Sequence, residues 1–131
     1  MKTREARETD FPLAAEWMAK RYGEPFPDDF FPKTGVVAED DSGRVRAIIP
    51  VYFEMNSAVA VAGHCMADPE NTARESYDAI DAALRAVVDF ARRNKRKYLV
   101  SIYGNRGVNR MAGRIGMIPA DIVEEKFLQL R

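Results

Sequence analysis

The only histidine and the only cysteine of this chain are neighbours in the sequence, His64 and Cys65. A histidine can exchange a proton near neutral pH, so His64 is a candidate general base. The competing interpretation is a hydrogen-bonded histidine at the edge of a sheet. No His/Asp pattern that would activate a nucleophile surrounds Cys65, which we expect to be a small core residue. With one residue of each type, a Cys/His zinc site and an intrachain disulfide are both excluded.

A second candidate site is the start of a helix after Pro69. Amide groups and the helix dipole at an N-terminus attract anions, so residues 71–76 could bind a phosphate. Simple capping of the helix explains the same residues. Thr72 and Glu75 have the spacing of a capping box, whereas Asp68 followed by proline fits an earlier cap. The sequence leaves both helix starts open.

Three arginines, Arg106, Arg110 and Arg114, recur every four residues and would share one face of a helix. Such a stripe could contact a cofactor phosphate, an acidic substrate or a nucleic-acid backbone, or it could be a solvated face. The 20 Lys and Arg residues equal the 20 Asp and Glu residues, and this neutrality argues against a nucleic-acid partner.

The length of 131 residues suits a single domain over 1–131. Hydrophobic residues make up 47% and charged residues 31%, a balance typical of a globular chain. The charged N-terminus lacks the apolar core of a signal peptide, and no run approaches the roughly 20 apolar residues of a membrane span. We therefore expect a cytoplasmic protein that makes no use of a membrane.

The elements that must position these candidates alternate in type along the chain, which favours an α/β or α+β layer structure. In the first third we expect a strand over 3–7 and a helix that Asp10 caps and that ends near Arg21. A proline-rich segment with aromatic anchors follows over 22–33. The turn residues 40–43 then predict a hairpin.

Two strands are expected after this turn. Pro50 lies within the first and cannot donate to a ladder, so it marks a bulge or an edge position. Residues 57–66 alternate small and branched side chains and predict one further strand. The apolar residues on one face of the first strand are Val45, Ala47, Ile49, Val51 and Phe53.

The strongest helix pattern lies between Pro69 and Asn94, with an apolar stripe along one face. A strand over 98–103 follows, then a helix that Asn105 caps and Gly116 ends. Residues 126–130 read as a last strand. On the exposed side of the long helix we expect two (i, i+4) ion pairs, Asp81–Arg85 and Asp89–Arg93.

This element order resembles the GNAT superfamily of N-acetyltransferases. The most specific local match is the segment 105–117, in which Asn105, Val108, Gly116 and Met117 fall at the spacing of a family motif. The resemblance implies a mixed, mostly antiparallel sheet flanked by helices. It also implies transfer of an acetyl or other acyl group from acetyl-CoA to an amine, with the acceptor unspecified and homodimers possible.

Acyl transfer to an amine needs a base, and the candidates are Glu54, at a strand end, and His64. Tyr103, at the end of the strand before the last helix, is a candidate phenol for protonating the leaving group. For Glu54 the alternative is an exposed charge. The cofactor-binding positions are Met66, Asn71, Thr72, Ala73, Arg74, Glu75, Ser76 and Asn105.

Several positions depart from the family pattern. Ala73, Glu75 and Tyr77 stand where the family has glycine or alanine in the loop that wraps the cofactor diphosphate. Ala112 stands where many members have a tyrosine that protonates the leaving thiolate. A catalytically inactive binding module of the same fold is therefore the alternative function. The acceptor region of the family corresponds here to Phe26, Asp28, Asp29, Phe30 and Phe31.

Overall fold

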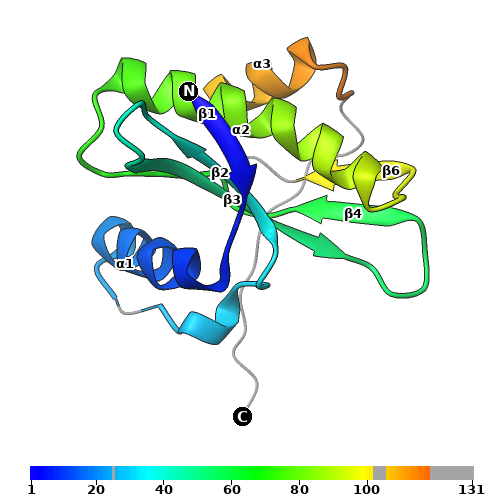
Figure 1. Ribbon diagram of the computed structural model, residues 1–131, viewed down its shortest axis with the longest axis horizontal. Coiled ribbons are helices and arrows are strands. Elements are labelled where there is room, and N and C mark those ends of the chain that lie inside the picture. Colours follow the sequence, from blue (N-terminus) through cyan, green and yellow to red (C-terminus); the bar gives the residue numbers. More distant parts are fainter. Residues whose placement is uncertain (25, 102–105, 119–131) are drawn as a thin grey trace.

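The computed structural model describes residues 1–24, 26–101 and 106–118, and they form a mixed sheet with helices on both faces (Figure 1). Tyr103, Asn105 and the strand predicted over 126–130 lie outside the described residues. The strands are β1 (Lys2–Glu5), β2 (Gly35–Glu39), β3 (Val45–Phe53), β4 (Val59–Ala62), β5 (Met66–Ala67) and β6 (Tyr98–Ser101). The helices are the short η1 (Glu8–Asp10) and η2 (Asp28–Phe30) and the longer α1 (Phe11–Tyr22), α2 (Ala73–Arg93) and α3 (Arg106–Arg114).

The strand order in the described sheet is β1-β2-β3-β4-β6, and β5 pairs with β3 beside this path. Every described pair of strands is antiparallel except β4 with β6, which run parallel. The predicted fold class, a mostly antiparallel mixed sheet flanked by helices, is therefore confirmed.

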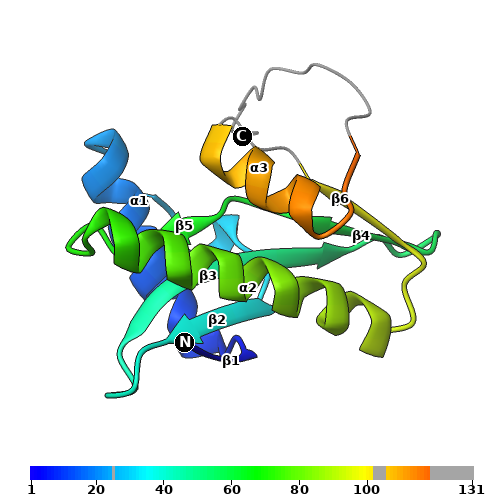
Figure 2. The same cartoon turned by 90° about the horizontal axis from the view of Figure 1, so that it is seen from above.

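The two faces of the sheet are covered by different helices. Figure 2 shows α2 and α3 on one face and α1 on the other, where η2 also packs. The alternation of β3 creates both interfaces, since Ala47, Ile49 and Val51 pack towards α2 while Ile48 packs towards α1. The face predicted for this strand is confirmed for Ala47, Ile49, Val51 and Phe53, but it is wrong for Val45, which packs with the core on the α1 side. The pairing of β3 with β2 shifts register between Ala47 and Val45, and this irregularity breaks the alternation.

Strands β4 and β5 replace the single strand that was predicted over 57–66. β4 pairs with Val51–Phe53 of β3 and β5 pairs with Ala47 and Ile48, which leaves residues 63–65 outside the ladder. The prediction of a continuous strand is wrong because the two pairings use different stretches of β3 with extra residues between them.

Pro50 lies opposite this break. It is fully buried, pairs with Gly35 of β2, and accepts a hydrogen bond from the amide of Gly63 at 2.8 Å. Its missing N–H therefore falls where β3 changes partner from β5 to β4. Of the two predicted positions for Pro50, a bulge or a sheet edge, the structure shows the irregularity inside the sheet.

Asp10 stands at the start of α1, as predicted, but its side chain does not cap that helix. The carboxylate accepts hydrogen bonds from both Nη atoms of Arg4, at 2.8 and 2.9 Å, and from the amide of Arg7 at 2.6 Å. Burial acts to raise the pKa of Asp10, but these hydrogen bonds outweigh burial and lower it. The residue therefore ties β1 to the turn before α1.

Helix α2 begins after Thr72 with a complete capping box, which decides between the two predicted starts. The pairing of Arg85 with Asp81 is confirmed at 3.2 Å. The pair Asp89–Arg93 is not formed, because Arg93 reaches across to Glu5 at 3.4 Å.

Helix α3 ends as the sequence indicates. Gly116 has a φ of +99°, which favours glycine, and the amide of Met117 donates to the carbonyl of Ala112 at 3.1 Å. Val108, Met111 and Ala112 are buried. Among the described helices, none is long and apolar enough to cross a membrane.

Candidate functional site

A pocket of about 180 Å³ lies at the break between β4 and β5. The pocket lies there because the pairing of β4 with β3 and β6 ends at Ala62, and the chain pairs with β3 again only at Met66. Gly63 leaves room here, since a Cβ would lie 3.0 Å from Cε2 of Tyr52 and 3.1 Å from Cγ of Pro50, and one of these side chains would have to shift. The lining is aromatic and apolar apart from one histidine, and comprises Phe30, Phe31, Pro50, Tyr52, Val61, Ala62, Gly63 and His64.

The aromatic wall of this pocket comes from η2 and the residue after it. The ring of Phe30 meets His64 edge-on, with 6.1 Å between ring centroids, and the hydroxyl of Tyr52 donates to the Phe30 carbonyl at 3.5 Å. Phe26 packs behind Phe30, with 4.7 Å between centroids. Of the residues named for the acceptor region, Phe30 and Phe31 thus line the pocket, and Asp29 is exposed. The Asp28 side chain lies outside the described residues.

His64 and Glu54 are not brought together. Glu54 follows the far end of β3, where its carboxylate accepts from the amide of Asn56 at 2.7 Å. That bond and one from the Ser57 hydroxyl lower the pKa of Glu54. An exposed carboxylate with a lowered pKa is a weak base, so Glu54 is a poor candidate for proton transfer.

Cys65 is half-buried and packs against the core beneath α2. This placement agrees with the small core residue expected from the sequence. Among the described residues, no group of three or more His, Cys, Asp and Glu side chains could hold a metal ion.

The start of α2 is closed by its own side chains. The hydroxyl of Thr72 accepts from the amide of Glu75 at 3.2 Å, and the carboxylate of Glu75 accepts from the amide of Thr72 at 2.8 Å. Arg46 approaches the same carboxylate at 3.9 Å. As folded, this turn does not fit a diphosphate, because Glu75 places a negative charge on one of the amides that would receive it.

The other cofactor positions predicted near this turn are also engaged. The Asn71 side chain exchanges two hydrogen bonds with Arg46, each at 3.0 Å. Arg74 pairs with Asp78 at 3.2 Å on the exposed side of α2. Met66 is buried under α1, and Ala73 and Ser76 belong to the first turn of α2. These assignments stay predictions.

Tyr77 joins α2 to α3. The guanidinium of Arg114 donates to the Tyr77 hydroxyl, and Arg74 lies over the ring at 5.8 Å from its centroid. Arg114 makes this bond at the surface, where it is exposed like Arg110, and the Arg106 side chain lies outside the described residues. Ala112 is buried and carries no proton to donate.

Sequence reasoning missed the ionic network that holds the loop before α2. Arg44 donates to Asp68 at 2.7 Å and to Glu70 at 2.9 Å, while Arg46 donates to Asp40 at 2.8 Å. Burial acts to raise the pKa of Asp68, but a bond from the Glu70 amide and the pairing with Arg44 lower it. The alternation of β3 could have indicated this network, because Arg44 and Arg46 fall two residues apart.

No family model and no curated protein matches the sequence. Solved structures match almost the whole chain. A probable acetyltransferase has a TM-score of 0.73 at 16% identity, covering 100% of this chain and 99% of its own. A ribosomal-protein-alanine N-acetyltransferase from Brucella melitensis biovar Abortus 2308 has 0.65 at 14%, covering 99% and 100%. An aminoglycoside acetyltransferase from an uncultured soil metagenomic sample, in complex with sisomicin, has 0.69 at 11%, covering 99% and 96%.

The chain has the GNAT fold. The resemblance stated from the segment 105–117 and from the element order is confirmed at the level of architecture. At these identities the likeness shows the GNAT fold alone, and the chemistry depends on the residues of this chain.

Proposed function

We propose that this GNAT-fold chain is an N-acyltransferase, with acetyl-CoA as the expected donor and an amine as acceptor. The observation that carries the proposal is the pocket at the end of β4. His64 lines this pocket just after Ala62, the last residue of β4 that pairs with β6. The acetyltransferase names of the structural neighbours support the same activity.

In this proposal the acceptor amine enters between η2 and β4. An amine attacks a thioester only when it is uncharged, and the proton it carries must be taken up. Of the eight residues that line the pocket, His64 carries the imidazole, the side chain that enzymes use most often for proton transfer. The nitrogen–carbon bond forms, the carbon–sulfur bond breaks, His64 takes the proton that the amine loses, and the leaving thiolate takes a proton from water.

The test is release of thiol from acetyl-CoA in the presence of amines, with peptide α-amines, lysine side chains and polyamines as separate arms. We expect His64→Gln to lower kcat by about a hundredfold or more, the usual contribution of a general base. Tyr52→Phe, in the same pocket, is the matched control and should retain activity. Absence of thiol release with every amine would remove the transferase proposal.

A second candidate function is a binding module that does not catalyse transfer. It is favoured by the Glu75 carboxylate on the Thr72 amide, which opposes binding of a diphosphate. S-acetylpantetheine, which lacks the diphosphate, separates the two candidates. A transferase hindered only at this turn should use S-acetylpantetheine about as well as acetyl-CoA, and a module should use neither.

A further inference from the structure

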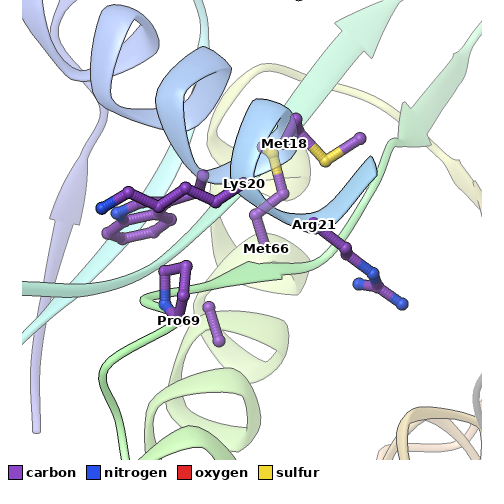
Figure 3. Close-up of a pocket in the computed structure, with 7 residues that line it drawn as sticks. Met18, Lys20, Arg21, Met66 and Pro69 are labelled. Carbon is purple, nitrogen blue, oxygen red and sulfur yellow. The ribbon is translucent and has the colours of Figure 1, made fainter. Parts of the chain in front are cut away.

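A second pocket, of about 250 Å³, lies between α1 and β5 on the side of the break away from the His64 pocket. Figure 3 shows Met18 and Met66 at its centre, Lys20 and Arg21 on opposite sides, and Pro69 at its border. Trp17 and Ala67 complete the lining. None of these seven residues is acidic, so the pocket has an apolar floor and two cations beside it.

The floor of this pocket is preformed. Trp17, Met18 and Met66 are each at most 5% exposed and belong to the core beneath α1. Two methionine sulfurs beside an indole make a surface that suits an aromatic or branched body, since thioethers contact aromatic rings favourably. The volume is below the roughly 300–1,000 Å³ of pockets for drug-sized ligands, so the occupant is a smaller molecule.

Within residues 1–24, 26–101 and 106–118, the indole N–H of Trp17 is a donor without an acceptor. Buried tryptophans usually find a hydrogen-bond partner, yet no described residue accepts from Trp17. Among the described side chains, the buried polar atom without a partner is Nε of Arg96, so the indole nitrogen is not sealed from solvent. Since Trp17 is 5% exposed and lines the pocket, we place this N–H at the pocket wall.

The two cations are available to a ligand. Lys20 pairs with Glu16 at 3.5 Å, but both side chains are more than half exposed and such a pair is weak. Within the described part of the chain Arg21 makes no ion pair, and it lies over the Tyr22 ring at 5.6 Å from its centroid. An anion at the mouth would therefore gain charge-assisted bonds without breaking a buried pair.

We propose that the pocket between α1 and β5 binds a small carboxylate with an aromatic or branched apolar body. The body lies on Trp17, Met18 and Met66, and the carboxylate lies at the mouth, where Lys20 and Arg21 flank it with positive charge. This inference does not depend on acyl transfer, because it needs neither His64 nor the start of α2.

Phenylpropionate is a suitable probe, and Trp17 is the only tryptophan of the chain, so its fluorescence reports on this pocket directly. We expect a saturable change in emission with a Kd of about 1 mM or tighter. Phenylpropionamide has the same shape without the charge and should bind at least about tenfold more weakly. Equal binding of acid and amide, or no saturable change with phenylpropionate, would overturn the proposal.

Variants test the assigned contacts. Lys20→Gln combined with Arg21→Gln should weaken phenylpropionate at least about tenfold, and Arg92→Gln, an exposed cation at the end of α2, is the control that should not. Ala67→Met should reduce binding by filling the pocket, with its melting temperature checked in parallel. Unchanged binding in the double variant, or displacement of phenylpropionate by CoA, would show that the pocket is not a separate carboxylate site.

Discussion

The two long helices on opposite faces of the sheet begin with acidic side chains that have different surroundings. At the start of α1, Asp10 is 7% exposed and receives two bonds from Arg4. At the start of α2, the Glu75 side chain is 41% exposed and receives one amide bond, with Arg46 at 3.9 Å. The first carboxylate is sealed inside a network, and the second remains accessible to solvent.

The carboxylate of Asp10 therefore has a structural role, whereas the carboxylate of Glu75 can be displaced. Removing Asp10 would leave the Arg4 charge partly buried without one of its partners, which is costly. Displacing Glu75 exposes an amide at a helix start, where water or another anion can replace the carboxylate. A diphosphate could therefore reach the start of α2 if Glu75 turned away, whereas the start of α1 has no such alternative.

The largest expected effect comes from Asp10→Ala. Breaking a buried ion pair by removing one partner costs about 3–5 kcal/mol. Because Arg4 also bonds to Glu39, we expect about 3 kcal/mol, the lower end of that range. Urea denaturation measures the loss. Glu8→Gln, at an exposed acid two residues earlier, is the control, and equal destabilisation by both substitutions would contradict the contrast between sealed and exposed acids.

Acid should destabilise the folded protein by protonating the buried carboxylates of Asp10 and Asp68. The pKa values of Asp10 and Asp68 are lowered in the folded protein, so their stabilisation is present above the unfolded value near 3.9 and is lost as pH falls through the folded values. The melting temperature should therefore drop steeply below about pH 4. Asp10→Asn should flatten this drop, and an unchanged acid profile in that variant would show that Asp10 does not contribute to it.

The sequence predicted those features that depend on neighbouring residues. The turn ending at Gly43, with a φ of +83°, and the stop at Gly116 follow from local backbone rules. The capping box at Thr72 and Glu75 was one of the two helix starts that the sequence left open. The alternation of β3 identified its core face from Ala47 to Phe53 for the same reason, but it failed at Val45, next to an irregularity in the pairing with β2.

Features that depend on distant residues were not predictable in this way. The break between β4 and β5 arises from two pairings along β3. The pocket at His64 needs η2 and β4 to meet, although they are about 30 positions apart in the sequence. His64 itself could be named from its residue type, but not its aromatic surroundings.

An intermediate effect is expected from Thr72→Ala. The hydroxyl of Thr72 satisfies the amide of Glu75, and loss of such a cap costs about 1 kcal/mol. Urea denaturation should show this loss, and Thr72→Ser should recover most of it because the hydroxyl is kept. If Thr72→Ser were as unstable as the alanine variant, the threonine methyl group and not the cap would be responsible.

The smallest effect on stability is expected from Glu75→Gln, although this substitution decides most about the donor. An exposed acid near a helix N-terminus contributes about 0.3–1 kcal/mol through the dipole, and glutamine can still accept from the Thr72 amide.

The same change removes the negative charge that opposes a diphosphate. We therefore expect calorimetry to show CoA binding at least about tenfold tighter than in the unaltered chain, a gain of about 1.4 kcal/mol. Asp89→Asn removes an equal charge near the other end of α2 and should leave CoA binding unchanged. If both variants bound CoA equally, the charge of the whole helix, and not the position of Glu75, would control the approach of the donor.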